Sequence, residues 1–343
     1  MDYPHQMWTL RYSIEDDNDH TSRILLHTLN DSHQRITNVT EMPEDILQYI
    51  FGFVEDDNLL LMKSVCKKFE TYAKISVLTG LIITSWVIDN TYLLKFNPAM
   101  FKNLKVLICP SSDLTEIPHI VGLEELECSG NYLNEIPHII GLKKLNCFNN
   151  QLVEIPNITG LKELNCSFNQ LTSIDYIIGL KILECTNNQL KQIPNITGLE
   201  KLDCSDNKVT EIPHIVGLKI LNCSRNKLTG IPDIAGLKFL NCSDNKIENI
   251  PHIIGLKHLI ASNNRLLRVP AIAGLTVLNC SGNQLRRVPY ISGLKELDCS
   301  RNQIYEIPHI VGLERLICHD NQLYEISFTG EFDYSFIYNA DFL

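Results

Sequence analysis

The chain has 343 residues, of which 44% are hydrophobic and 20% are charged, a composition typical of folded domains rather than of a disordered polymer. Its 30 Lys and Arg residues against 40 Asp and Glu residues give a net charge of −10, which argues against sequence-independent binding to nucleic acid phosphates. The longest nearly apolar stretch, residues 75–88, is shorter than the ~20 residues that a membrane-spanning helix requires. No basic region followed by an apolar stretch begins the chain, so we expect no signal peptide, no membrane contact and an intracellular location in cytoplasm or nucleus.

Residues 1–40 are polar and have no hydrophobic periodicity. They include an acidic cluster at Glu15, Asp16, Asp17 and Asp19. We expect this segment to be a flexible arm.

A helical pattern begins at residue 41 and continues to residue 74. Pro43 suits the first position of a helix, and Glu44 and Asp45 suit the positive end of its dipole. Apolar residues then recur at helical spacing over 46–54 and again over 59–69. A module of about 35 residues can rarely bury so much apolar surface alone, so we expect it to dock on the rest of the chain or on another protein.

This helical module resembles an F-box domain. Residues 42–51 read MPEDILQYIF and residues 65–69 read VCKKF, close to the Leu-Pro start and the Val-Cys-Lys-x-Trp/Phe end of that family, with Met42 in place of the usual Leu. The resemblance implies that the module binds the Skp-type adaptor of a cullin–RING ubiquitin ligase. The residues that would make this contact are Pro43, Ile46, Leu47, Ile50, Phe51, Leu59, Leu60, Val65 and Cys66. Alternatively, the same residues only pack the helices together or cap the rest of the chain.

Residues 75–102 are apolar and lie out of phase with the sequence that follows. We interpret them as a connector and an N-terminal cap.

A repeat of 19 residues fills the chain from residue 103 to about residue 330. Glycines recur at this spacing from Gly122 to Gly312 without an insertion or deletion, and one further unit in phase precedes them, which makes 12 units. The unit reads G-L-x-x-L-x-C-S-x-N-x-L-x-x-I-P-x-I-x, and we number its positions 1 to 19 from the glycine. A fixed period near 20 residues indicates a solenoid, in which stacked coils bury one continuous core.

The positions of the unit predict which side chains face inward. Apolar residues at positions 2, 5, 7, 12, 15 and 18 form the expected core, and the alternation after position 4 predicts a short strand. Stacked strands would form a parallel sheet on one face. Proline at position 16 in 10 of the 12 units excludes a helix on the return path, which we expect to be extended or 3₁₀.

Two polar or reactive residue types also follow the repeat. Asparagine at position 10 is expected to bond the free backbone groups of neighbouring turns. Eleven of the 12 cysteines occupy position 7, where Ala261 replaces the missing one, so we interpret them as small core residues. A line of single thiols has neither the geometry of a disulfide nor the convergent ligands of a zinc site, and we expect no metal and no cofactor.

The run L-x-x-L-x-C-x-x-N-x-L resembles the leucine-rich repeat, with Cys where Leu is more common. The resemblance implies a curved solenoid of the α/β-horseshoe class, with a concave face that binds proteins. Nineteen residues is short for that family, and helices on the convex side are not expected. The nearly identical units without gaps also resemble repeat proteins of giant viruses, which would place the chain inside a host cell.

Two groups of exposed residues are candidate partner-binding sites. Phe148 and Phe168 interrupt a face of Asn, Ser, Asp and Glu at positions 4, 6, 8 and 9, although ordinary repeat drift would also explain them. A basic stripe at position 11 comprises Lys208, Lys227, Lys246 and Arg265. The alternative is a solvated ladder whose charge Asp206 and Asp244 partly neutralise.

No Gly-rich phosphate loop, nucleophile elbow or isolated catalytic pair stands out from the repeat, so we expect no enzyme activity. Two functions remain. The first is the substrate-recognition subunit of a Skp–cullin–F-box ubiquitin ligase that binds an unknown protein substrate. The second is a non-catalytic leucine-rich-repeat scaffold with no ubiquitin role. Alternating aromatic residues in 331–343 suggest a C-terminal cap.

Overall fold

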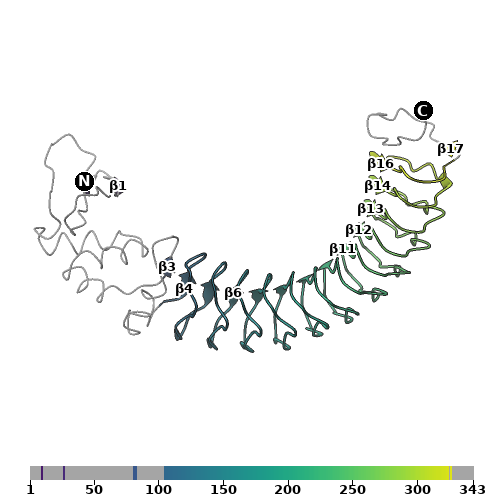
Figure 1. Ribbon diagram of the computed structural model, residues 1–343. Coiled ribbons are helices and arrows are strands. Elements are labelled where there is room, and N and C mark those ends of the chain that lie inside the picture. Colours follow the sequence, from purple (N-terminus) through teal and green to yellow (C-terminus); the bar gives the residue numbers. More distant parts are fainter. Residues whose placement is uncertain (1–8, 11–25, 28–79, 83–103, 324, 327–343) are drawn as a thin grey trace, which may run out of the picture.

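The computed structural model describes residues 9–10, 26–27, 80–82, 104–323 and 325–326. The F-box-like module at 41–74 and the proposed cap at 331–343 lie outside these residues, as do almost all of the arm at 1–40 and of the connector at 75–102. From residue 104 to residue 323 the coils stack into an arc, with the strands on its inner side (Figure 1).

Each 19-residue unit contributes one strand at positions 4 to 6, and the strands form a parallel sheet. In the part of the chain that the structure describes, this sheet has 13 strands in the order β3 to β14 followed by β16. The strands are β3 (Gly80–Ile82), β4 (Val106–Ile108), β5 (Glu125–Glu127), β6 (Lys144–Asn146), β7 (Glu163–Asn165), β8 (Ile182–Glu184), β9 (Lys201–Asp203), β10 (Ile220–Asn222), β11 (Phe239–Asn241), β12 (His258–Ile260), β13 (Val277–Asn279), β14 (Glu296–Asp298) and β16 (Arg315–Ile317). From β4 onward, the register pairs residues that are 19 apart, such as Leu126 with Leu145.

Two short pairs lie outside this sheet. β1 (Thr9–Leu10) pairs with β2 (Leu26–His27) in antiparallel fashion. β15 (Glu306–Ile307) pairs in parallel with β17 (Glu325–Ile326), at positions 14 and 15 of the last two units.

The predicted core positions are confirmed by their burial. Side chains at positions 2, 5, 7, 12, 15 and 18 are at most 8% exposed throughout residues 104–318. Each of the 11 described cysteines is buried at 0% exposure with a free thiol, and Ala261 is buried in the same row. The stacked coils therefore share one apolar core, to which each unit up to residue 311 adds six side chains.

The asparagines at position 10 form the predicted ladder. Asn150 Nδ2 donates to the carbonyl oxygens of Cys128 (3.0 Å) and Cys147 (3.1 Å), while Asn150 Oδ1 accepts from the backbone N–H of Leu133 (3.0 Å). The pattern recurs from Asn131 to Asn321. Each carboxamide thus satisfies backbone groups of two coils that the turn would otherwise leave unpaired inside the protein.

The return path on the convex side contains no helix over residues 104–323, as the prolines predicted. A turn at the end of each unit reverses the chain, and the glycine at position 1 has a positive φ, for example +88° at Gly236. Histidines at position 17 add bonds between coils here. His119 Nε2 lies 3.2 Å from the carbonyl oxygen of His138, and His138 Nε2 lies 3.1 Å from the carbonyl oxygen of Asn157.

The prediction that position 8 belongs to the exposed face is wrong for several units. Ser167, Ser205, Ser243 and Ser300 are buried, with at most 6% exposure. The hydroxyl of Ser205 donates to the position 6 carboxylate of its own coil, Asp203, over 2.6 Å, and this folds the side chain back against the strand end. The freely exposed face is therefore narrower than the sequence indicated.

Candidate functional site

A hollow of about 460 Å³ lies on the concave face between β4 and β9. It contains the carboxylates expected on this face together with two lysines. Lys144 Nζ lies 3.8 Å from Glu125 and 3.7 Å from Glu163, and Lys201 Nζ lies 2.6 Å from Glu184. Ion pairs between neighbouring strands therefore line this hollow, and its four carboxylates outnumber its two lysines.

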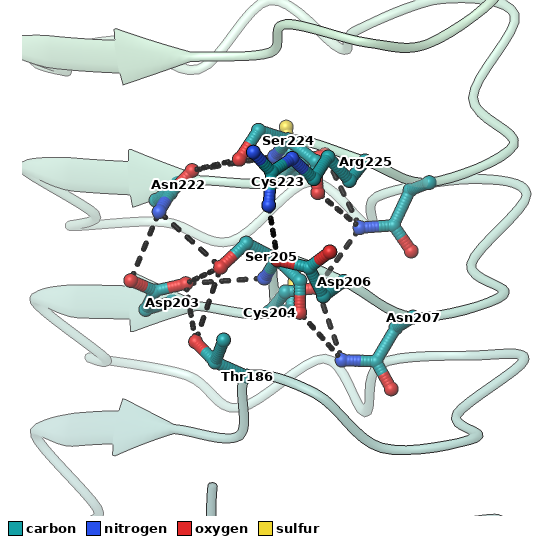
Figure 2. A network of polar contacts seen from close by, with 11 residues as sticks. Thr186, Asp203, Cys204, Ser205, Asp206, Asn207, Asn222, Cys223, Ser224 and Arg225 are labelled. Carbon is teal, nitrogen blue, oxygen red and sulfur yellow. Dashed lines mark hydrogen bonds and ion pairs between the residues drawn. The ribbon is translucent and has the colours of Figure 1, made fainter. Parts of the chain in front are cut away.

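Asp203 at the end of β9 has a structural role (Figure 2). Its Oδ1 accepts from the hydroxyls of Thr186 (2.9 Å) and Ser205 (2.6 Å), and its Oδ2 accepts from Asn222 Nδ2 (2.9 Å). These donors come from three successive coils. The network cross-links the ends of the strands and uses both carboxylate oxygens.

Phe148 and Phe168 form an aromatic pair where β6 and β7 end. Their ring centroids are 5.0 Å apart with an interplanar angle of 53°, and Phe168 is 44% exposed. Phe168 also has a left-handed backbone, with φ at +56°, at a position where other units carry Ser, Asn, Asp, Gly or Arg. A bulky residue in this conformation is strained and half exposed, a combination typical of functional surfaces.

The predicted basic stripe is exposed on four successive coils. Lys208 Nζ donates to Gln189 Oε1 (3.1 Å), whereas Lys227, Lys246 and Arg265 have no side-chain partner among the described residues. The expected neutralisation by Asp206 and Asp244 is wrong. Asp206 lies 3.5 Å from Arg225 instead, and Asp244 accepts from Asn263 Nδ2 (2.9 Å), because position 9 contacts position 9 of the next coil.

An apolar patch that the sequence analysis missed covers β10 to β13. Position 4 holds Ile220, Phe239, His258 and Val277, and Ile260 interrupts the asparagines of position 6. The rings of Phe239 and His258 pack edge to face with centroids 6.1 Å apart. We refer to these five residues as the apolar saddle. The sequence feature that could have predicted this patch is the absence of carboxylates at positions 4 and 6 in four consecutive units.

Lysines at position 3 follow the edge where the strands begin. Lys181 and Lys219 both pair with Glu200, over 3.2 and 2.6 Å, and these contacts lower the pKa of that carboxyl. Lys238 and Lys257 instead donate to the carbonyl oxygens of the glycines that open the next coils, over 3.3 and 3.1 Å. Three of these lysines precede residues of the apolar saddle: Lys219 is paired with Glu200, whereas Lys238 and Lys257 have no carboxylate partner within the described chain.

A second row that the sequence analysis missed lies at position 19. Its β-branched side chains are 65–76% exposed because they immediately precede the glycine turn. The large apolar members of this row are Val121, Ile140, Ile178, Val216, Ile254 and Val311.

The cysteine row is chemically inert. Burial raises the pKa of Cys109 and Cys242 to about 12 and that of most other row members further, so the thiolate is not formed near neutral pH. Among the residues described, no group of three or more His, Cys, Asp or Glu side chains could hold a metal ion.

Comparisons with solved structures recognise this architecture, whereas no family model and no curated sequence matches the chain. The functional domain of InlJ from Listeria monocytogenes, which includes a cysteine ladder, is 27% identical with a TM-score of 0.63, over 72% of this chain and 64% of that one. The fold is a leucine-rich-repeat solenoid. YopM from Yersinia enterocolitica is 29% identical with a TM-score of 0.58, over 66% of this chain and 57% of that one. The leucine-rich effector YopM from Yersinia pestis is 28% identical with a TM-score of 0.60, over 66% and 69%. This solenoid thus spans less than two thirds of InlJ and of the Yersinia enterocolitica YopM.

The nine residues predicted to bind the adaptor lie outside the described residues. No described helix has the length and apolar character that crossing a membrane requires.

Proposed function

We propose that the chain is a protein-interaction subunit that couples a ubiquitin ligase to a substrate. The leucine-rich-repeat fold is consistent with protein–protein interaction. The observation that carries the proposal is one chain that holds both an F-box-like sequence at 41–74 and a solenoid with an exposed strand face. In this arrangement the repeats select the partner and the helical module recruits the adaptor.

The proposed role needs proximity and orientation rather than catalysis by this chain. A substrate receptor brings its partner close to an enzyme held elsewhere in the complex, which raises the effective concentration of the reacting groups. The solenoid offers a long, stiff surface for this purpose, because each coil is bonded to the next by strand register and by the asparagine ladder.

The aromatic pair Phe148–Phe168 is the partner contact that we propose on the edge of the sheet. Aromatic side chains that are partly exposed and held against each other supply large contact area at low entropic cost. A similar solenoid provides a precedent for ligand binding: the plant peptide hormone receptor RGFR1, solved in complex with RGF2, is 25% identical with a TM-score of 0.60 over 71% of this chain.

A binding experiment tests the adaptor half of the proposal. The purified chain is mixed with a recombinant Skp-type adaptor, and complex formation is measured by gel filtration and calorimetry. We expect a complex that is lost in Ile50→Asp plus Phe51→Asp, because two charges would enter an apolar interface. The control is Ile140→Asp plus Ile178→Asp, which also introduces two carboxylates in place of apolar side chains, at positions that are 75% and 67% exposed.

The alternative function is a leucine-rich-repeat scaffold with no ubiquitin role. Absence of any complex between the unmutated chain and the adaptor would favour this alternative and overturn the ligase role. Equal binding by both double variants would show that the F-box-like residues are not the contact.

A further inference from the structure

The concave face over β10 to β13 differs from the rest of the sheet in both charge and polarity. The four complete repeats from residue 217 to residue 292 hold 10 Lys and Arg residues against 3 Asp and Glu residues, a net charge of +7 in a chain whose total is −10. No Asp or Glu occupies positions 4 or 6 in these repeats, where the residues of the apolar saddle and asparagines are found instead.

Two basic rims flank the apolar saddle. The first rim comprises Lys238 and Lys257, where the strands begin, and the second comprises Lys227, Lys246 and Arg265, beyond the strand ends. All five side chains are exposed, and none has a carboxylate partner among the described residues. No carboxylate of the described residues neutralises these five charges, so they can attract an acidic partner.

The acidic residues of the same repeats do not cover the apolar saddle. Asp244 at position 9 accepts a hydrogen bond from Asn263, Asp233 lies at position 17 on the convex path, and Glu248 lies at position 13 past the strand. The concave surface between the two rims is thus apolar and amide-lined, and the nearest strand carboxylates are Asp203 on β9 and Glu296 and Asp298 on β14.

We propose that the apolar saddle and its two basic rims bind an acidic protein segment with apolar side chains flanked by carboxylates on both sides. The inference rests on the proposed function of the solenoid as an interaction surface and names the chemistry of its partner. Apolar side chains of the partner bury Phe239 and Ile220, while its carboxylates reach Lys238 on one edge and Lys246 on the other. Charge complementarity sets orientation and association rate, and apolar burial sets the lifetime of the complex.

A protein segment fits this surface better than single-stranded nucleic acid does. Binding of unpaired bases relies on open aromatic faces on which the bases stack. Three of the five members of the apolar saddle are aliphatic, and the ring of Phe239 packs edge to face against His258. Aliphatic side chains suit the apolar face of a polypeptide.

Substitutions borrowed from other units keep the fold while changing the surface. The rim variant is Lys227→Gln, Lys246→Gln and Arg265→Gln. Glutamine already occupies position 11 in three successive units, at Gln151, Gln170 and Gln189. The saddle variant is Ile220→Glu plus Phe239→Glu, because position 4 already carries Glu125 and Glu163. The control changes Lys105, Lys162 and Lys191 to Gln, which removes the same number of charges elsewhere. Circular dichroism verifies that each variant folds.

The test selects short random peptides from a display library on the whole chain and then measures each enriched peptide against the variants. We expect enriched peptides to combine Asp and Glu with apolar residues. Binding should fall about tenfold or more for the rim and saddle variants, and remain within about twofold for the control. Added sodium chloride should weaken binding to the unmutated chain more than binding to the rim variant.

Four results would overturn the proposal. Enriched peptides without an acidic bias, or undiminished binding to the saddle variant, would show that another surface is used. An oligothymidine probe that binds more tightly than the selected peptides, and loses binding in the same variants, would assign the surface to nucleic acid. Loss of peptide binding only in Phe148→Ser plus Phe168→Asn would overturn the role of the apolar saddle but leave the proposed interaction function standing.

Discussion

Phe148 and Phe168 lie on neighbouring coils with their ring centroids 5.0 Å apart, and only Phe168 has a left-handed backbone. The same position holds Asn149 one coil earlier and Asn187 one coil later, both also left-handed. Asparagine tolerates this conformation through local hydrogen bonds, whereas a bulky side chain is strained by it. Arg225 and Arg301 have the same backbone conformation at this position, so the feature that distinguishes Phe168 is its ring contact with Phe148, and this contact favours a binding role for the aromatic pair.

Replacement of Phe168 should therefore separate stability from binding. Phe168→Asn and Phe168→Leu both remove the ring contact, but only Asn relieves the backbone strain. We expect Phe168→Asn to be more stable than Phe168→Leu by about 1 kcal/mol in urea denaturation, with partner binding weakened in both. Equal stability of the two variants would show that the left-handed backbone at this position imposes no strain.

The asparagine ladder should be a major source of stability. Asn150→Ala leaves the carbonyl oxygens of Cys128 and Cys147 and the N–H of Leu133 without their buried partners. We expect a loss of roughly 2–4 kcal/mol in the free energy of unfolding. The neighbouring exposed residue provides the control, and Gln151→Ala should change stability by less than about 0.5 kcal/mol. A similar effect of both substitutions would contradict the assigned role of the ladder.

The glycine turns offer a matched pair of substitutions. An added Cβ would meet no atom within 4 Å at Gly236 or at Gly230, but only Gly236 has a positive φ, at +88°. Gly236→Ala should destabilise the chain by about 1 kcal/mol or more, because Ala resists this conformation. Gly230→Ala should be neutral or stabilising by up to about 1 kcal/mol, because it restricts the unfolded chain. Thermal unfolding of both variants measures the difference, and a reversed order would contradict the turn geometry.

Stability should fall at alkaline pH because of the buried thiols. Burial raises the pKa of Cys109 to about 12, whereas an exposed thiol in the unfolded chain titrates near pH 8.5–9. The unfolded state therefore loses thiol protons first as the pH rises. Above the thiol pKa of the unfolded chain, each buried thiol lowers the free energy of unfolding by about 1.4 kcal/mol per pH unit. The stability that the protonated thiols contribute is fully present at pH 7 and is lost progressively towards pH 12.

The urea midpoint at pH 7, pH 8.5 and pH 9.5 measures this effect. Ala already occupies position 7 of the unit at Ala261, so Cys166→Ala should preserve the fold and slightly reduce the dependence of the urea midpoint on pH. Thiol-reactive reagents at pH 8 should label the cysteines of the row only after unfolding. A midpoint that is unchanged or higher at pH 9.5 would contradict the sealed thiol row.

The sequence predicted the coil well because the same requirement recurs in every unit. The strand at positions 4 to 6, the buried cysteines and the bonds of Asn150 all follow from a period that leaves no other way to bury the apolar residues. The binding surface was harder to predict because it depends on departures from the repeat. Phe239 and Ile220 resemble ordinary variation at position 4 in the sequence. Only the pairing of β10 with β11 shows that the two side chains lie next to each other in one apolar patch.

Side-chain direction explains the two wrong expectations. Ser205 looked exposed by alternation, but its hydroxyl bonds Asp203 and turns the side chain towards the strand end. Asp206 seemed close enough in sequence to neutralise Lys208, but in the stacked coils it lies next to Arg225. Neighbour relations between coils, rather than distance along the chain, decide which charges meet.

The central claim is that the helical module at 41–74 and the concave face of the solenoid recruit different proteins. Affinity purification from a eukaryotic cell, with three forms of the chain as bait, tests it most directly: the unmutated chain, Ile50→Asp plus Phe51→Asp, and Ile220→Glu plus Phe239→Glu. We predict that the first double variant loses the Skp-type adaptor and cullin but retains other partners, and that the second loses an acidic partner but retains the adaptor. Absence of the adaptor with every bait, or the same partners recovered with all three, would contradict the account.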